Sequence, residues 1–487
     1  MPLARFDRYV DRHARAFTER LQNLCRMPSV AARGTGMRAM AEAVEQLMQN
    51  AGAGTRAFKI GNGYPIIYGE MGGGPRCFLV YGHYDVQPVG HLTDWSFGPF
   101  AASIVDGKLY ARGAANSKGD LLARLAAAEA YQKTYGKLPV CLRFIVEGED
   151  GLGSPSLYRF ASEHADMLSA EGCFWDEGYK DTTERPIISL GFKGITFIEL
   201  RVYGARSELH SKWGAIVSNP AWRLVQALST LTSPKGVITI DGFSSHVASI
   251  TPEDLEAVKT IDLDEAGLKR EFRIAGWLRG MKGATVVREH IFGATCTICG
   301  IQTGHTEAGA KTVLPSAAMA RLDFRLVPDL TPGLVADLLR EHLDTRGFTD
   351  IEIIQLGSAP LAKSSPQSSV ARAAIESATE VYGAAPIVYP MDPASGPVGA
   401  VCSAGNPPTP VVSFGTSYFA SNPHGPDENI RLDDFLQSIK YFGRIIQHLG
   451  GGGKAAGKAN TSGITKTSGI TKSGSGERSQ RSNPSRG

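Results

Sequence analysis

A histidine and an aspartate two residues apart, His83 and Asp85, follow a short apolar run in the segment GHYDVQP, residues 82–88. Alternate residues of a strand point to the same face, so an extended segment places both side chains on one side. A carboxylate beside an imidazole suits a metal site, in which the histidine binds the ion and the aspartate supports the ligand set. The pair alone is a weak signal, and its meaning depends on residues further along the chain.

Six further blocks rich in acidic residues, histidine and glycine come after this motif in order. They are LYARGAANSKGD (109–120), EGEDGLGSPSL (147–157), FWDEG (174–178), ELHS (208–211), DFRLVPDLTP (323–332) and NPHGPDEN (422–429). The ordered series resembles peptidase family M20, which includes dipeptidases, carboxypeptidase G2, aminoacylase-1 and acetylornithine deacetylase. The segments HYDVQP and FRLVP are most similar to the dipeptidase branch. The resemblance covers the body of the chain and leaves out the tail.

The resemblance implies an α/β fold with two parts. The first is an αβα zinc-peptidase-like catalytic domain, and the second is an inserted α/β sandwich lid through which such chains form homodimers. Members of the family hydrolyse an amide near a free carboxylate, using two zinc ions bridged by an aspartate and a water. A glutamate acts as the general base.

Several positions carry over to metal binding and catalysis. His83 matches the histidine of the first metal, Asp85 its supporting aspartate, and Asp176 the non-bridging aspartate of that metal. His424 matches the histidine of the second metal. His210 matches the lid histidine that reaches the active site of the partner subunit and stabilises the oxyanion.

Three positions match the family's substrate-binding residues. Arg325 matches the lid arginine that binds the substrate carboxylate, a task that suits a guanidinium fork. Asp392 and Ser395 align with the acidic residue and the serine of a dipeptidase segment whose two middle glycines are Pro393 and Ala394 here.

Three departures affect the metal ions. Asn116 stands where the family has the bridging aspartate, Asp150 stands at the general-base position, and Gly151 stands where a second glutamate binds metal. The first site keeps His83 and Asp176, with the neutral amide of Asn116 as a third donor. The second site keeps His424 alone. Since zinc usually needs three protein ligands, we expect at most one zinc ion, or none, with manganese or cobalt as alternatives.

Other acids could replace the missing ones. Glu147 and Glu149 lie on the same strand as Asp150, and Glu177 follows Asp176. A shift of one residue in the turn at 147–151 would bring Glu149 or Asp150 to the metal.

The pattern supports three functions. The first is hydrolysis of a small peptide or N-acyl amino acid. The second is binding of such a molecule without hydrolysis, and the third is a different, metal-free amide reaction that uses His210 and Asp150.

The elements that must position these residues follow from hydrophobic periodicity. Helical spacing covers residues 4–52 and 121–135, and short apolar runs predict strands at 66–71, 77–83 and 141–150. Strands that alternate with helices predict a layered α/β sheet, in which ligands lie beyond the carboxyl ends of the strands. His83 and Asp150 both fall at such ends.

The pattern in the middle of the chain indicates a separate unit. Strands are expected at 195–204, 320–327 and 350–355, and helices at 219–231 and 333–344. A helix at 369–382, a strand at 411–414 and a helix at 432–449 then resume the first pattern. The predicted division is 1–193 and 357–450 for the catalytic domain, 194–356 for the lid, and 451–487 for a tail.

Charge is unevenly distributed between body and tail. The net charge is +3, yet the segment from Gly451 onward holds seven basic residues and one acidic residue. The body therefore has 44 basic and 47 acidic residues, which argues against nucleic acid as its partner. The tail repeats TSGITK at 461–466 and 467–472, and we predict a disordered segment, either a solvated appendage or an electrostatic tether.

The remaining features indicate a cytoplasmic protein. No run approaches the roughly 18–20 apolar residues of a membrane span, and MPLARFDRYV at the start is too polar for a signal peptide. Seven scattered cysteines favour reduced thiols. Cys296 and Cys299 form a lone CxxC within a predicted strand, which is typical of ordinary strand residues. His290 and His305 match no motif.

Overall fold

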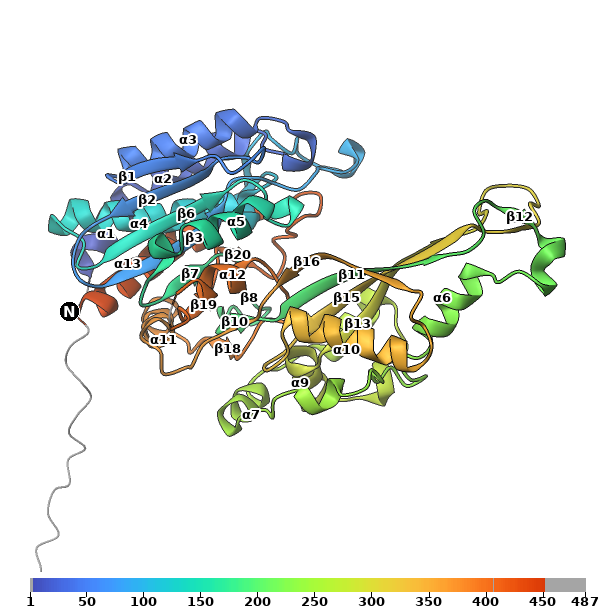
Figure 1. Ribbon diagram of the computed structural model, residues 1–487. Helices are drawn as coiled ribbons and strands as arrows, with labels where there is room; N and C mark the ends of the chain where they lie inside the picture. Colours follow the sequence, from blue (N-terminus) through green and yellow to red (C-terminus); the bar gives the residue numbers. More distant parts are fainter. Residues whose placement is uncertain (1–2, 406, 452–487) are drawn as a thin grey trace, which may run out of the picture. The chain divides into compact units, whose positions relative to one another are not determined.

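A mixed eight-stranded sheet organises the larger part of the computed structural model, which describes residues 3–405 and 407–451 (Figure 1). The strand order is β1-β2-β6-β3-β7-β19-β9-β18. Its strands are β1 (Gly54–Phe58), β2 (Ile66–Met71), β3 (Cys77–His83), β6 (Cys141–Glu147), β7 (Cys173–Trp175), β9 (Ile187–Ser189), β18 (Ile387–Tyr389) and β19 (Val411–Ser413). The central pairs β6–β3, β3–β7 and β7–β19 are parallel, so their carboxyl ends meet at one edge.

Helices cover both faces of this sheet. One face carries α1 (Ala4–Arg12), α2 (Ala14–Arg26), α3 (Met37–Asn50), α4 (Gly119–Tyr135), α11 (Ser369–Tyr382) and α13 (Leu432–Gly450), which enclose the largest apolar core. The other face carries α5 (Pro155–Glu163) and α12 (Val398–Ser403) over a smaller core. Almost every residue of α4 up to Ala130 is buried, because the helix packs between the sheet and α13. The expected αβα arrangement is confirmed.

A second, antiparallel sheet forms the inserted lid. Its order is β13-β15-β11-β16, built from β11 (Gly194–Tyr203), β13 (Thr295–Thr303), β15 (Ala317–Leu326) and β16 (Glu352–Ala359). The helices α6 (Pro220–Leu228) and α10 (Pro332–Thr345) pack against it around a separate apolar core. Burial alternates along β15, as expected for a sheet with one covered face.

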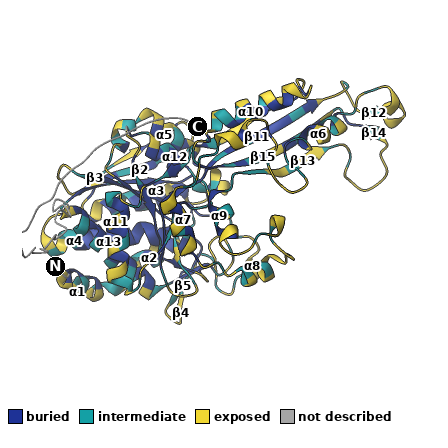
Figure 2. Cartoon of the chain, turned by 90° about the horizontal axis from the view of Figure 1, so that it is seen from below, coloured by how far each residue is buried: buried dark blue, intermediate teal, exposed yellow. Residues whose placement is uncertain are grey.

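Short elements complete the lid and the loops. They are α7 (Pro252–Lys259), α8 (Glu265–Phe272), α9 (Ala284–Phe292), β4 (Ser103–Val105), β5 (Lys108–Tyr110), β8 (Tyr179–Lys180), β10 (Gly191–Phe192), β12 (Leu209–His210), β14 (Val313–Leu314), β17 (Ala362–Lys363), β20 (Ser417–Tyr418) and β21 (Asn429–Arg431). In both ribbon views β12 lies at the end of the lid strands that points away from the larger sheet (Figures 1 and 2). Figure 2 also shows that this end of the lid is largely exposed.

Some sequence-based expectations need adjustment. The strand expected at 350–355 is β16, which begins at Glu352 and runs to Ala359, past the boundary predicted at residue 356. The domain boundaries themselves remain predictions. Cys296 and Cys299 lie on β13 as expected, and all seven cysteines are free thiols. Within the described residues, no helix is long and apolar enough to cross a membrane, and the predicted tail, apart from Gly451, lies outside them.

Candidate active site

Three neighbouring strands deliver the first group of predicted residues. β3 ends at His83, and Asp176 follows the last residue of β7. β6 ends at Glu147, and the short helical turn after it, Asp150–Leu152, carries Asp150. Parallel strands bring their carboxyl ends together, so side chains far apart in sequence meet at one edge of the sheet.

His83 is the centre of this group. Its Nδ1 lies 3.2 Å from Oδ1 of Asp85 and 3.1 Å from the Asp85 carbonyl oxygen. Its Nε2 lies 3.8 Å from Oδ2 of Asp176 and 3.9 Å from Oδ2 of Asp150. This Nε2 is buried and has no hydrogen-bond partner. A buried polar atom without a partner is costly unless a ligand occupies the space that it faces.

The carboxylates and the ring perturb one another. Burial alone would lower the pKa of His83, but the charges of Asp150, Asp85 and Asp176 outweigh it and raise that pKa well above its usual range. Burial raises the pKa of Asp176 to about 6, against the opposing charges of His83 and Arg124. Burial also opposes ionisation of Asp85, yet the His83 ring and the backbone N–H groups of Gly151 and Asp150 lower its pKa. Asp85 is therefore the fixed anion that orients His83.

Asn116 sits opposite this group with its amide paired. Its Oδ1 lies 3.1 Å from Nε2 of His424, and burial lowers the pKa of His424, which favours the neutral ring. Next to Asn116, the hydroxyl of Ser117 donates to Oδ2 of Asp176 at 2.6 Å. The structure therefore links the two predicted metal sites through Asn116 and Ser117. No sequence motif singled out Ser117.

The alternative acids in the 147–151 turn are engaged elsewhere. Glu149 accepts the backbone N–H groups of Tyr64 and Ser156, and Glu147 accepts the hydroxyl of Tyr81. The backbone N–H of Gly151 donates to Oδ2 of Asp85 at 2.9 Å, which fixes the turn in its ungapped register. Asp150, rather than Glu149, is thus the acid that faces His83.

Two buried charges position the site from outside it. Arg124 of α4 donates to the carbonyl oxygens of Tyr81, Trp175 and Phe414 at 2.9, 2.6 and 2.7 Å. Glu428 accepts a guanidinium N–H of Arg112 at 2.6 Å and the backbone N–H groups of Ala115 and Asn116. Glu428 lies within the motif NPHGPDEN, which the sequence analysis identified. The contacts of Glu428 with Arg112, Ala115 and Asn116 were not predicted.

The remaining predicted residues are distributed over the chain. Arg325 lies on β15, and its Nε lies 3.2 Å from Oδ1 of Asp323. Asp392 accepts the hydroxyl of Ser189, and Ser395 donates its hydroxyl to the Gly194 carbonyl where β11 begins.

His210 does not join the His83 group. It lies exposed on β12 at the far end of the lid (Figure 1).

The donor set can be tested against the metal ions that the sequence implies. Within residues 3–405 and 407–451, no group of three or more His, Cys, Asp or Glu side chains is arranged to hold an ion. Asn116 is uncharged and paired with His424, and Gly151 offers no side chain, so these two positions supply no carboxylate to an ion. The donors that remain at this edge are the unpaired Nε2 of His83 and the carboxylate of Asp176 beside it.

The fold and these residues define a peptidase-like hydrolase. Residues 79–448 match the model of peptidase family M20/M25/M40, and the chain belongs to this family. The chain is 27% identical to a Cys-Gly metallodipeptidase of Schizosaccharomyces pombe, with 92% of this chain and 98% of that one covered. It is 28% identical to the Beta-Ala-His dipeptidase of Rattus norvegicus, over 70% and 73% of the two chains.

Solved structures agree with this assignment. An M20 family metallo-carboxypeptidase from Sulfolobus solfataricus is 33% identical and superposes with a TM-score of 0.82, covering 88% of this chain and 98% of that one. Human carnosine dipeptidase 1 has the same fold, with a TM-score of 0.75. Members of this family use divalent metal ions, so the chain is a hydrolase of a metal-dependent family.

Proposed function

We propose that the chain hydrolyses the amide bond of a small carboxylate-bearing substrate, a dipeptide or an N-acyl amino acid. The observation that carries this proposal is the buried, unpaired Nε2 of His83, which faces the carboxylates of Asp176 and Asp150. A bound ligand or a water in the space between these groups would give this atom a partner. The dipeptidase relatives and the carboxypeptidase neighbour support the substrate class.

The proposed site holds at most one divalent ion, with zinc first and manganese or cobalt as alternatives. His83 and Asp176 would hold it, with the amide oxygen of Asn116 as a neutral donor. When bound, the ion supplies Lewis acidity that polarises the scissile carbonyl. A site with one carboxylate in place of several binds such ions more weakly than a complete dinuclear site.

The chain's own residues supply the remaining roles. Asp150 takes the proton of the attacking water, and its partly exposed carboxylate can reach both solvent and the His83 group. Asp85 holds the His83 ring through Nδ1. Arg325 binds the substrate carboxylate, and Asp392 and Ser395 line the substrate side.

We also propose a homodimer formed through the lid, in which His210 of each chain reaches the site of the other. His210 lies far from the His83 group of its own chain (Figure 1). The lid exposes large apolar side chains, among them Tyr203 (62%), Ile216 (75%) and Trp222 (66%). Exposed apolar side chains of this size are available for a contact between two lids.

The scattered thiols support a cytoplasmic location.

Metal analysis combined with a dipeptide assay tests the proposal. Purified protein should contain no more than one ion per chain and should hydrolyse dipeptides when zinc, manganese or cobalt is added. Replacing His83 by alanine should abolish turnover, whereas replacing the exposed His91 by alanine is the matched control and should not. Two tightly bound ions per chain would contradict the proposed site.

A second function, binding without hydrolysis, is favoured by one observation. The Asn116–His424 hydrogen bond uses the very groups that a dinuclear site would need. Absence of both metal and turnover in the wild-type chain would support this alternative. Recovery of both in the double variant Asn116→Asp with Gly151→Glu would show that the lost carboxylates are the cause.

The double variant should be compared with a single variant. A Cβ atom at position 151 would lie 3.2 Å from Oδ2 of Asp85 and from Nε2 of Gln87, so these side chains must shift slightly. The single variant Asn116→Asp avoids this crowding and should be measured alongside.

A further inference from the structure

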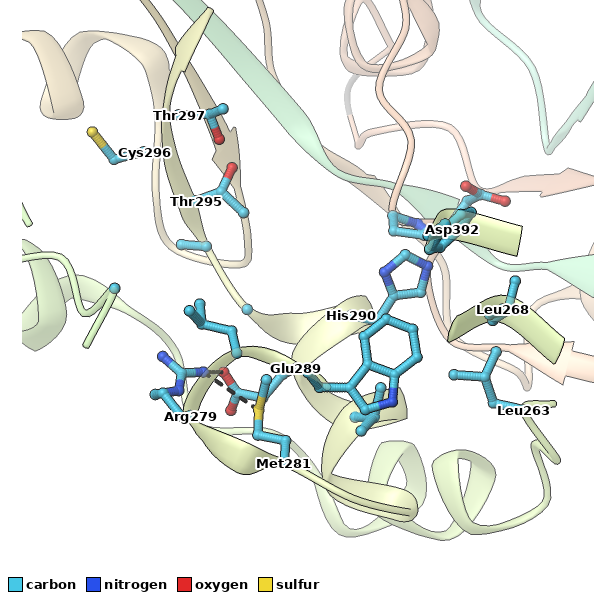
Figure 3. Close-up of a pocket in the computed structure, with 18 of the residues that line it drawn as sticks. Leu263, Leu268, Arg279, Met281, Glu289, His290, Thr295, Cys296, Thr297 and Asp392 are labelled. Carbon is cyan, nitrogen blue, oxygen red and sulfur yellow. Dashed lines mark hydrogen bonds and ion pairs between the residues drawn. The ribbon is translucent and has the colours of Figure 1, made fainter. Parts of the chain in front are cut away.

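A large cavity lies between the lid helices and the loops of the larger sheet. Its volume is about 750 Å³, which is within the range of sites for small organic ligands. Most of its wall is apolar, and its larger apolar side chains include Leu263, Leu268, Phe272, Trp277, Met281 and Tyr389. Figure 3 shows part of the lining, with Leu263 and Leu268 on one side and Thr295 and Cys296 on the other.

One end of the cavity is polar and lies near the segment that follows Asp176. Asp392 and His290 lie at this end, and in Figure 3 the His290 ring points toward Asp392. Tyr179 lines the cavity and stands two residues beyond Glu177. Glu177 follows Asp176 directly, so the short segment from Asp176 to Tyr179 connects one catalytic carboxylate with the cavity wall.

Arg325 lies beside the part of the wall that β13 forms. Thr295 lines the cavity and stands directly opposite Arg325 in the β13–β15 pair, and its hydroxyl accepts the Arg325 backbone N–H at 3.2 Å. Residues directly opposite in an antiparallel pair project to the same face, so the guanidinium leaves the sheet on the cavity side.

The contacts of Lys193 also indicate that Arg325 lies near this wall. Its Nζ donates to the carbonyl oxygens of His290 and Gly293, two residues of the cavity wall, at 2.8 and 2.6 Å. Burial lowers the pKa of Lys193 to about 8, and the nearby charge of Arg325 adds to the decrease. A cation that suits a carboxylate thus lies near the polar part of the cavity, on the side of His290 and Gly293.

We propose that this cavity receives the large apolar side chain of the substrate residue that carries the free carboxylate, while Arg325 binds the carboxylate itself. The substrates are then peptides with an aromatic or long aliphatic C-terminal residue, or N-acyl derivatives of such amino acids. A glycine or alanine at this position leaves the apolar wall in contact with water. The inference rests on the proposed amide hydrolysis and adds the side-chain class.

Two matched dipeptide series test the inference. The first varies the C-terminal residue in Ala-Gly, Ala-Leu and Ala-Phe, and the second varies the N-terminal residue in Gly-Ala, Leu-Ala and Phe-Ala. Burial of a Leu or Phe side chain should raise kcat/KM for Ala-Leu and Ala-Phe over Ala-Gly by about 10- to 100-fold. Equal values of kcat/KM for Ala-Gly, Ala-Leu and Ala-Phe would overturn the inference, and so would a side-chain preference found only at the N-terminal residue. Either result would leave the proposed hydrolysis intact.

Variants that fill the cavity test whether it causes the preference for a large C-terminal side chain. Ala294→Phe and Leu268→Trp enlarge two different parts of the wall, and each should lower the Ala-Phe to Ala-Gly ratio of kcat/KM toward one. Ala336→Phe is the control, because Ala294 and Ala336 are both half-buried against the same lid core but Ala336 does not line the cavity. A ratio that all three variants leave at the wild-type value overturns the inference. If Ala294→Phe instead changes the sedimentation coefficient and not the ratio, a second copy of the chain occupies the cavity.

Equilibrium binding separates this inference from the proposed function. N-acetylphenylalanine should bind more tightly than N-acetylglycine by about 10-fold or more, and Ala294→Phe should remove the difference. If no dipeptide is hydrolysed but N-acetylphenylalanine still binds more tightly, the proposed pocket is supported and the proposed hydrolysis is contradicted. Equal affinities for the two acids overturn the pocket, whether or not dipeptides are hydrolysed.

Discussion

The difference between Asn116 and an aspartate is one atom, yet it changes the charge of the whole site. An aspartate would add a second anion between His83 and His424, whereas the amide pairs with His424 as a neutral acceptor. The anions that remain, Asp85, Asp150 and Asp176, gather around His83 alone. Cation binding is therefore expected on the His83 side of Asn116.

Glu147 gives a prediction for stability against pH. Burial, followed by the charge of Asp150, raises its pKa from the ordinary 4.5 to about 8. Between pH 4.5 and pH 8, Glu147 is protonated in the folded chain and ionised in the unfolded chain. Its contribution to the free energy of unfolding is therefore complete below pH 4.5 and is lost as the pH rises to 8. Glu147→Gln should therefore gain stability relative to wild type across this window, by up to about 1.4 kcal/mol per pH unit.

Urea unfolding at pH 5, 6.5 and 8 measures this effect. Glu149→Gln serves as the control, because Glu149 accepts two backbone N–H groups and its neutralisation should destabilise the fold at all three pH values. A Glu147→Gln effect that is the same at each pH would show that the group does not titrate in this window.

Arg325 gives a prediction for ligand binding. Arg325→Ala should weaken the binding of N-acetylphenylalanine by about 1.5–3 kcal/mol, the range for hydrogen bonds to charged groups. Isothermal calorimetry measures the change. Arg321→Ala is the control, since Arg321 lies on the same strand but pairs with Glu199. An affinity that Arg325→Ala leaves unchanged would remove Arg325 from the proposed carboxylate site.

The sequence predicted the members of the His83 group better than it predicted their neighbours. The strand pattern predicted that His83 and Asp150 lie at the carboxyl ends of strands, and they lie at the end of β3 and just after β6, because parallel strands carry such motifs to one edge. Ser117 was not predicted, since its contact with Asp176 joins segments distant in sequence. No spacing rule within a single motif reports such contacts.

At the scale of elements, the loop that holds Asn116 depends on an anchor from the other end of the chain. Glu428, just before β21, is fully buried and accepts an N–H of Arg112 together with the backbone N–H groups of Ala115 and Asn116. Three donors on one carboxylate fix the path of the backbone from Arg112 to Asn116.

Removal of this anchor should be costly. Glu428→Ala leaves the buried Arg112 without its partner, so the free energy of unfolding should fall by about 3–5 kcal/mol. Glu184→Ala breaks the exposed pair with Arg431 and should cost no more than about 1 kcal/mol. Chemical denaturation compares the two. Losses of equal size would mean that the Arg112–Glu428 pair contributes no more than a surface ion pair.

The elements that sequence predicted are long and strongly patterned. The helices α4, α11 and α13 and the strands β3, β6 and β11 were expected within a few residues of their observed ends. The helices α7, α8 and α9 were missed, because they have only eight or nine residues and charged side chains interrupt their apolar positions. The caps at Thr251 and Asp264, each accepting a backbone N–H three residues on, were the available signals.

At the scale of the whole molecule, the proposed dimer predicts complementation between two inactive variants. His83→Ala disables the site of its own chain, whereas His210→Ala disables the site of the partner. After subunit exchange in an equal mixture, about a quarter of the sites should be intact, because half of the dimers pair one variant with the other. Dipeptide turnover before and after exchange measures the recovery. Two inactive variants that stay inactive when mixed would place His210 outside the partner's site.

The carbonyl contacts of Arg124 have a consequence for how activity is lost. One guanidinium on α4 joins the ends of the strands that carry His83 and Asp176 to the end of β19. The spacing of these strand ends therefore depends on contacts in the packed interior as well as on the exposed edge of the sheet. On heating, catalysis should disappear in one cooperative step together with the helicity of α4, without a gradual decline at lower temperature.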